Sequence, residues 1–258
     1  MSPWLAVLVS AAVALAAHRS RALSATGAYA AVAVGAGVLL GAGWAGAAAL
    51  GIFFVSSSLL SWRAPAASAD AKGSRRDHRQ VLANGGPAAL GALVGLTEPG
   101  LGVWMATASL AAAAADTWAT SVGAWSRSPP RHLLTWQAVA PGTNGGITPL
   151  GTAGGLAGAL LVGLAGGVAG QAPLLVPIAA LVGFSGMLAD SLLGAAVQGR
   201  FECPRCNLSS EWRVHGCGTP TISKGGWAWL DNDGVNALAT AFGAGGGWVA
   251  WAWLSSAS

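Results

Sequence analysis

Residues 151–189 read GTAGGLAGALLVGLAGGVAGQAPLLVPIAALVGFSGMLA, without a single Asp, Glu, Lys or Arg. The short sequence around Pro173 divides this stretch into two apolar segments, 149–169 and 173–196. A helix needs about 20 predominantly apolar residues to cross the hydrocarbon core of a bilayer. The stretch therefore predicts two membrane-spanning helices joined by a short turn.

The composition of the whole chain agrees with this prediction. Of its 258 residues, 53% are hydrophobic and only 9% are charged. A soluble domain usually carries about 25% charged residues, so this chain has too few to cover a water-soluble surface. Three cysteines, two of them in a CxxC, do not suggest a disulfide scaffold. The sequence also lacks the aromatic and basic stripe typical of nucleic-acid binding.

Further apolar segments occur along the chain and bring the total to eight. We therefore expect an all-α fold, a polytopic transmembrane bundle of about eight helices. No basic residue precedes the first segment, so we interpret it as a membrane helix and not as a signal peptide. Residues 1–258 are expected to form a single integral membrane domain, with a Cys/His loop over 200–230. The segments run roughly over 3–17, 23–42, 44–61, 81–96, 100–121, 149–169, 173–196 and 234–254.

The basic residues predict the orientation. All 13 Lys and Arg residues fall in the odd-numbered loops between these segments. Cytoplasmic loops of membrane proteins carry an excess of Lys and Arg. We therefore expect a multi-pass protein of the inner (plasma) membrane, with the odd-numbered loops in the cytoplasm and both termini outside. The Cys/His loop is the last of these cytoplasmic loops.

Two acidic residues lie within apolar segments, Asp116 in the fifth and Asp190 in the seventh. Carboxylates are costly inside a membrane and usually functional. Both are expected near the cytoplasmic ends of their helices, where they can share one hydrated pocket. Mg²⁺ binds through one or two carboxylates together with water and substrate phosphates, so the pair suits Mg²⁺. The alternative is that each Asp is structural and bonds a neighbouring helix.

A third acidic group, Asp231-Asn232-Asp233, precedes the last segment, and Asn236 follows one turn later. Asp233 and Asn236 are three residues apart and share a helix face. An Asp or Asn at such a place can also cap the helix N-terminus. The group has more carboxylate and carboxamide side chains than a cap needs, so we expect a functional role as well.

Residues 141–148, PGTNGGIT, form a glycine-rich segment that leads into a helix. Glycine lets a backbone wrap closely around an anion, and a helix N-terminus favours phosphate. The segment is not a Walker A motif, because GK[ST] is absent. An ordinary turn back into the membrane explains it equally well.

A basic stretch, KGSRRDHRQ over 72–80, is followed by Asn84-Gly85-Gly86. Basic residues beside a membrane are often a topology signal or a contact to lipid headgroups. The sharper hypothesis is that Lys72, Arg75 and Arg76 hold nucleotide phosphates, since guanidinium groups supply paired donors. The residues alone favour neither interpretation.

The 200–230 loop contains all three cysteines, Cys203, Cys206 and Cys217, together with His215. C-x₂-C followed by H-x-C supplies four ligands, enough for a closed tetrahedral zinc site. Such a site would be structural, because no coordination position stays open. The alternative is a set of unligated cytosolic thiols.

Glycines in the sixth segment form GxxxG pairs, which let helices approach closely. We expect them to pack helices within one subunit, and a homodimer is the alternative. The pairs are Gly151/Gly155, Gly154/Gly158 and Gly163/Gly167.

Five motifs taken together resemble one family of membrane proteins. In this chain they read KGSRRDHRQVLANGG (72–86), AADTWATSVGA (114–124), PGTNGGITPLGT (141–152), GMLADSLLGAAVQ (186–198) and GWAWLDNDGVNALA (226–239). In this order they resemble the family called domain of unknown function 92, which includes transmembrane protein 19 and a phytyl-phosphate kinase of plant vitamin E biosynthesis. Ser121 departs from the pattern, which has a Glu after ADTWAT.

The resemblance implies a CTP-dependent kinase that converts a prenyl (phytyl-like) monophosphate into the diphosphate at the cytoplasmic face. Its partners would be a prenyl-phosphate lipid and a nucleotide, with CTP as phosphate donor. On this basis we expect Mg²⁺ at Asp116, Asp190 and Asp233. The other cofactor-binding residues are expected in the same motifs: Lys72, Arg75, Arg76, Asp77, Asn84, Thr143, Asn144, Gly145, Gly146, Ser191, Gln198, Asn232 and Asn236.

Three other functions remain open on the sequence. A CTP-dependent cytidylyltransferase acting on a lipid phosphate would use the same groups but release diphosphate. A transporter or flippase of a polar or phosphorylated solute would suit glycine-rich helices and intramembrane acids, but it needs a path to both faces. A purely structural membrane protein would not need Asp116 and Asp190.

Overall fold

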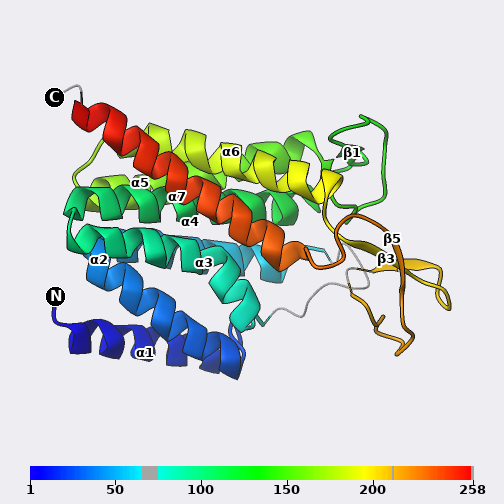
Figure 1. Cartoon of the computed structure of the whole chain (residues 1–258), viewed down its shortest axis with the longest axis horizontal. Helices are drawn as coiled ribbons and strands as arrows, with labels where there is room; N and C mark the ends of the chain where they lie inside the picture. The colour runs from blue at the N-terminus through cyan, green and yellow to red at the C-terminus, as the bar shows by residue number, and fades with distance from the viewer. Residues whose placement is uncertain (66–74, 211, 257–258) are drawn as a thin grey trace.

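The computed structural model describes residues 1–65, 75–210 and 212–256, which form a bundle of helices (Figure 1). Both termini lie at one end of the bundle, and the short strands lie at the opposite end, which we call the loop end. The helices are α1 (Pro3–Arg19), α2 (Ala25–Arg63), α3 (His78–Leu93) with the 3₁₀ turn η1 (Val94–Leu96), α4 (Pro99–Gly123), α5 (Pro149–Ala169), α6 (Leu175–Ala196) and α7 (Asn232–Ser256).

The expected number of about eight helices is wrong, because the described residues form seven α-helices. The second and third expected segments lie in one 39-residue element, α2, whose helical geometry is interrupted at Gly43 (φ 58°, ψ −149°). Glycine adopts positive φ readily. The interruption reverses the chain, because Gly27 and Phe53, which a straight helix would separate by about 39 Å, both lie against Arg76.

Local sequence explains where several helices begin. Ser2, Ser24 and Thr148 each precede a helix and accept a hydrogen bond from the backbone N–H three residues later. Asp77 and Gln80 form a capping box at the start of α3, in which each side chain accepts from the backbone N–H of the other residue. Such caps stabilise a helix by about 1 kcal/mol, so Asp77 has a structural role.

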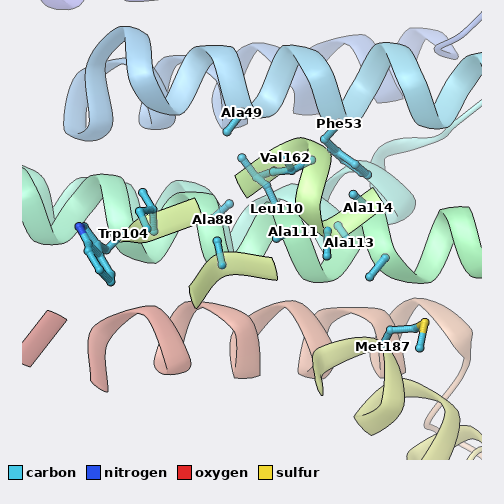
Figure 2. Close-up of a cluster of buried hydrophobic side chains, with 14 residues drawn as sticks. Ala49, Phe53, Ala88, Trp104, Leu110, Ala111, Ala113, Ala114, Val162 and Met187 are labelled. Carbon is cyan, nitrogen blue, oxygen red and sulfur yellow. The ribbon is translucent and has the colours of Figure 1, made fainter. Parts of the chain in front are cut away.

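Helix α4 is central, and it packs against α2, α3, α5, α6 and α7. Its middle turns consist largely of small residues, and Ala111, Ala113 and Ala114 are buried (Figure 2). Small residues let neighbouring backbones come close. For example, a Cβ added at Gly243 of α7 would lie 2.8 Å from the carbonyl oxygen of Ala108. This close packing brings the ends of several helices together at the loop end.

The GxxxG glycines of α5 also pack inside the chain. A Cβ added at Gly158 would lie 2.7 Å from Trp118 of α4, and one at Gly163 would lie 2.8 Å from the Val176 carbonyl oxygen of α6. Packing within one chain therefore accounts for these two glycines, and a homodimer stays a prediction.

By length and composition, α2, α5 and α6 can cross a membrane. Helix α1 is apolar but has only 17 residues. Large apolar side chains are exposed on the bundle, among them Trp4, Leu90 and Leu181. Such an exterior is expected where lipid rather than water surrounds a protein.

Short strands at the loop end were not part of the all-α expectation. Strand β1 (Arg131–His132) pairs with β2 (Gly146–Ile147), and β3 (Arg200–Cys203) lies between β4 (Leu208–Ser210) and β5 (Ile222–Gly225). All these pairings are antiparallel. The strands are too short to show the alternating pattern by which a sequence predicts a strand.

Candidate functional site

A cavity of about 1140 Å³ receives side chains from all seven α-helices. Apolar side chains of α1 and α2 line one part of it, which we call the apolar part. Polar groups from α3, α4, α6, α7 and the loop between α4 and α5 line the other, which we call the polar part. Most of the site residues predicted from the sequence line this cavity: Arg76, Asn84, Asp116, Thr143, Asn144, Gly145, Gly146, Asp190, Ser191, Gln198, Asn232 and Asn236.

Asp116 and Asp190 both line the cavity, and their side chains lie close enough to interact with each other. Each stands about two turns before the loop-end terminus of its helix, α4 or α6. Two carboxylates so close repel each other unless a proton or a cation lies between them. The pair therefore has the arrangement in which two carboxyl oxygens can bind one divalent cation.

Three hydroxyl side chains near Asp116 also line the cavity, and sequence reasoning missed them: Thr117, Thr120 and Ser121. The hydroxyl of Thr117 donates to the carbonyl oxygen of Ala113 (3.0 Å). The available signal was helical spacing, since Asp116 and Thr120 are four residues apart and share a helix face. At Ser121, where the resemblance led us to expect a Glu, a hydroxyl lines the cavity instead.

The glycine-rich loop folds over the end of α6. Gly145 has a φ of 72°, and a Cβ there would lie 2.9 Å from the Cα of Ala195 and 3.0 Å from the carbonyl oxygen of Ser191. Glycine satisfies both the conformation and the space. Within the described residues, the backbone N–H groups of Asn144 and Gly145 donate to no acceptor. Adjacent free N–H groups on a cavity wall suit an anion.

Thr143 and Gly146 have a different role in this loop. The hydroxyl of Thr143 donates to the carbonyl oxygen of Ala140 (2.8 Å), and the N–H of Gly146 donates to the carbonyl oxygen of Thr143 (2.9 Å). Both residues line the cavity, but these hydrogen bonds hold the turn. They therefore shape the loop that presents the neighbouring N–H groups.

Gln198 follows the last turn of α6 and lines the cavity with only 3% of its surface exposed. Its Nε2 atom is buried and has no hydrogen-bond partner among the described residues. A buried donor left unpaired costs about 1–3 kcal/mol. Ser191 lines the same wall, next to Asp190. A ligand with acceptor oxygens would satisfy the Gln198 amide.

Arg76 reaches the cavity from the basic stretch. Its backbone is held by hydrogen bonds with Ala22 and Ser24, each 3.0 Å long. Its guanidinium carbon lies 5.6 Å and 5.5 Å from the ring centroids of Phe53 and Phe54. Burial lowers the pKa of Arg76 to about 10, so the side chain stays charged at neutral pH.

The other predicted members of this stretch lie differently. Arg75 is exposed and does not line the cavity, and Lys72 lies outside the described residues. Asp77 caps α3 and does not line the cavity either. Asn84 does line it, and its amide donates to the carbonyl oxygen of Gln80 (3.0 Å).

The acidic group at the start of α7 is divided between two surroundings. Asn232 and Asn236 line the cavity. Asp231 forms an ion pair with Arg79 of α3, and its other oxygen caps the first turn of α7 (3.0 Å). Asp233 is buried, does not line the cavity, and lies 3.8 Å from the Nε atom of Arg79. The structure thus places Asp233 beside an arginine, away from the cavity wall.

The Cys/His loop gathers its four predicted zinc ligands outside the cavity. The ligand atoms of Cys203, Cys206, His215 and Cys217 all lie within 4.8 Å of one another. The sulfur atoms of Cys203 and Cys217 are 3.6 Å apart, much longer than the roughly 2.05 Å of a disulfide. Nδ1 of His215 lies 3.1 Å from the sulfur of Cys217. Thr219 and His215 lower the pKa of Cys217 to about 5 through hydrogen bonds.

The apolar part of the cavity is the part that sequence reasoning missed. Its lining includes Val9 and Val13 of α1 and Leu39, Trp44 and Phe54 of α2. Apolar side chains occur all around a membrane helix, so nothing in the sequence distinguishes those that face a cavity. Helices α1 and α2, which contain none of the five family motifs, therefore supply this wall.

Comparison with known proteins identifies a family and several relatives of this chain. The family model described as integral membrane protein DUF92 matches residues 8–244. The chain is 31% identical to Protein PGR of Arabidopsis thaliana over an alignment of 271 positions, which spans 90% of each protein. It is 36% identical to an uncharacterized membrane protein of Methanocaldococcus jannaschii over 120 residues, which cover 46% of this chain and 50% of that protein. No solved structure matches the chain.

Proposed function

The chain belongs to the integral membrane protein family DUF92, and we propose that it transfers a phosphate from CTP to a prenyl (phytyl-like) monophosphate, giving the prenyl diphosphate and CDP. The choice of CTP and of a prenyl chain rests on the family resemblance of the five sequence motifs. The choice of a phosphoryl transfer to a lipid rests on the cavity.

The division of the cavity into two parts is the observation that carries this proposal. A prenyl phosphate has an apolar tail and an anionic head. The apolar part, between α1 and α2, suits the tail, and the polar part, at the loop end, suits the head. Ligand pockets commonly measure about 300–1,000 Å³, so a cavity of about 1140 Å³ has room for a lipid phosphate and for the phosphates of a nucleotide.

Mg²⁺ fits the carboxyl pair at the polar part. Asp116 and Asp190 present oxygen ligands to one cavity, and Mg²⁺ binds in just this way beside substrate phosphates. A bound Mg²⁺ would supply positive charge to neutralise the substrate phosphates. Asp233, the third ligand expected from the resemblance, lies beside Arg79 and stays a prediction.

Phosphate positioning would fall to Arg76 and to the glycine-rich loop. Arg76 lies against Phe53 and Phe54, at the boundary between the two parts, where a lipid head would meet its tail. The free N–H groups of Asn144 and Gly145 suit a second phosphate. Phosphoryl transfer needs mainly such positioning and charge neutralisation.

The transfer step needs no base from the protein. At neutral pH a phosphate monoester carries about −1.5 to −2 charges, so its oxygen is already a nucleophile. That oxygen forms a bond to the terminal phosphorus of CTP, while the bond from this phosphorus to the oxygen of the β-phosphate breaks. CDP leaves with the electron pair of the broken bond, and the lipid becomes a diphosphate.

The test is a nucleotide assay on the full chain, purified in detergent with Mg²⁺. Prenyl monophosphates of several lengths are supplied with CTP or ATP, and products are identified by mass spectrometry. We expect CDP and a prenyl diphosphate from the wild type and neither from Asp116→Asn or Asp190→Asn. Release of diphosphate, with CMP left on the lipid, would instead identify a cytidylyltransferase.

A matched control separates the cavity acids from acids elsewhere. Asp77→Asn makes the same chemical change outside the cavity, and Asn is also a good helix cap. This variant should keep the wild-type rate. If folded wild-type protein turned over no nucleotide with any prenyl phosphate, the kinase proposal would be refuted and transport of a phosphorylated solute would become the better hypothesis.

A further inference from the structure

The region between α6 and α7 has little apolar material with which to fold. Over 200–230, the buried apolar side chains among the described residues are Phe201, Cys203 and Leu230. Units of fewer than about 40 residues usually need a disulfide, a metal or a partner. The cysteines of this region are free thiols. Another cross-link is therefore needed to explain its defined three-stranded sheet.

The four Cys and His side chains come from two separate hairpin segments, one around the β3–β4 turn and one between β4 and β5. Cys203 ends β3, and Cys206 lies in the turn that joins β3 to β4. The N–H of Asn207 closes this turn by donating to the carbonyl oxygen of Cys203 (2.9 Å). His215 and Cys217 lie in a second turn, between β4 and β5. Each segment therefore offers two ligand atoms to the same point.

We propose that Cys203, Cys206, His215 and Cys217 bind one Zn²⁺ ion that joins these two segments and holds the sheet together. Thiolate and imidazole are the ligands that zinc prefers in structural sites. Tetrahedral Zn–S bonds of about 2.3 Å place two sulfur atoms roughly 3.8 Å apart, close to the 3.6 Å between Cys203 and Cys217. Four protein ligands leave no open position, so the ion is structural.

The sheet connects this ion to the cavity. The N–H of Gly199 donates to the carbonyl oxygen of Leu230 (2.9 Å), and the N–H of Trp227 donates to that of Val197 (2.8 Å). These bonds tie the end of α6 to the segment that leads into α7, on either side of Gln198, which lines the cavity. The zinc ion therefore positions the first turn of α7 relative to α6.

Metal analysis of the full chain in detergent, purified without added metal, tests binding. We expect about one zinc per chain in the wild type. The zinc content of Cys206→Ser and of His215→Gln should be lower by at least about tenfold. Ser209→Ala, an exposed change on β4 of the same sheet, is the control and should keep its zinc. Wild-type protein that neither contains zinc nor takes it up at this ratio would overturn the proposal.

Hydrogen exchange tests whether zinc positions this region. It uses wild-type protein, so the result does not depend on whether a variant folds. Removing zinc from folded wild-type protein with a chelator should raise deuterium uptake over 199–231, leave α4 unchanged, and be reversed by added zinc. Unchanged uptake over 199–231 after zinc removal would overturn this role. Neither measurement uses lipid or nucleotide, so a failure here is distinct from a failure of the proposed kinase activity.

Discussion

Two acidic groups lie near the loop end, and their surroundings differ. Asp116 and Asp190 come from α4 and α6, meet side chain to side chain and line the cavity. Asp231 and Asp233 come from the start of α7 and both lie beside Arg79. The first pair brings two negative charges together, whereas the second pair shares an arginine.

The partner of each acid therefore indicates whether the acid binds a ligand or has a structural role. An acid beside an arginine is already neutralised by the protein, and it gains little from a metal. Two carboxylates that meet in a cavity are stabilised by a cation from outside the chain. We therefore expect substitutions at the first pair to abolish activity and substitutions at the second pair to affect mainly stability.

The largest effect is expected at the cavity pair. Asp116→Asn or Asp190→Asn should lower kcat at least about 100-fold, the range seen when a group that stabilises transition-state charge is removed. Thermal unfolding should be little changed or shifted upward, because the substitution removes repulsion between the two carboxylates. Steady-state kinetics and a melting curve of the same sample check both parts. A kcat near that of the wild type would remove the metal role from this pair.

Arg76 should have the next largest effect. Arg76→Gln removes a charged donor at the boundary of the apolar and polar parts, and a hydrogen bond to a charged group contributes about 1.5–3 kcal/mol. We expect the KM for the lipid phosphate to rise by about 10-fold to 100-fold. Arg75→Gln, the same change at the exposed neighbour, should stay close to the wild type. Equal effects of the two changes would point to a general charge effect instead.

A smaller effect is expected at the glycine-rich loop. Gly145→Ala places a Cβ on a residue with φ 72° and against Ala195, and strain of this kind costs about 1–3 kcal/mol. The loop should move away from α6, which raises the KM for the nucleotide. Gly86→Ala, in α3 with open space around it, is the matched control. A wild-type KM in Gly145→Ala would exclude phosphate binding by this loop.

The smallest effect is expected at the start of α7. Asp231→Asn keeps the helix cap but removes the charge that pairs with Arg79. The side chain of Arg79 is about half exposed, and exposed ion pairs contribute about 0–1 kcal/mol to stability. Activity should change less than about threefold, well within the range of one weak ion pair. Asp233→Asn tests whether the buried acid of this group also binds the metal. A loss of activity as large as that of Asp116→Asn would make Asp233 a third metal ligand.

The sequence was sufficient to predict much of the polar part. The helices that carry Asp116 and Asp190 followed from apolar runs that each contain one acid, a pattern that the membrane makes costly and therefore informative. The Cys/His cluster followed from ligand spacing alone. In contrast, nothing in the order of residues shows that Asp233 lies beside Arg79, because that contact joins α7 to α3 across the bundle.

The apolar part could not be predicted, because its lining residues have the same character as residues that face lipid. Val9 and Leu39 line the cavity, while Leu8 and Leu90 are exposed on the bundle, and no periodic signal separates the two sets. The predicted number of helices was wrong for a related reason. Segments on both sides of Gly43 were correctly identified as apolar, but the sequence does not reveal that they are joined through this one non-helical residue into the single element α2.

The turn at Gly43 also bears on how the chain enters a membrane during synthesis. Between Ala25 and Arg63 there is no charged residue, and the reversal uses a single glycine instead of a hydrophilic loop. The two halves of α2 can therefore leave the insertion machinery together, as one preassembled hairpin, without a polar segment having to be carried across.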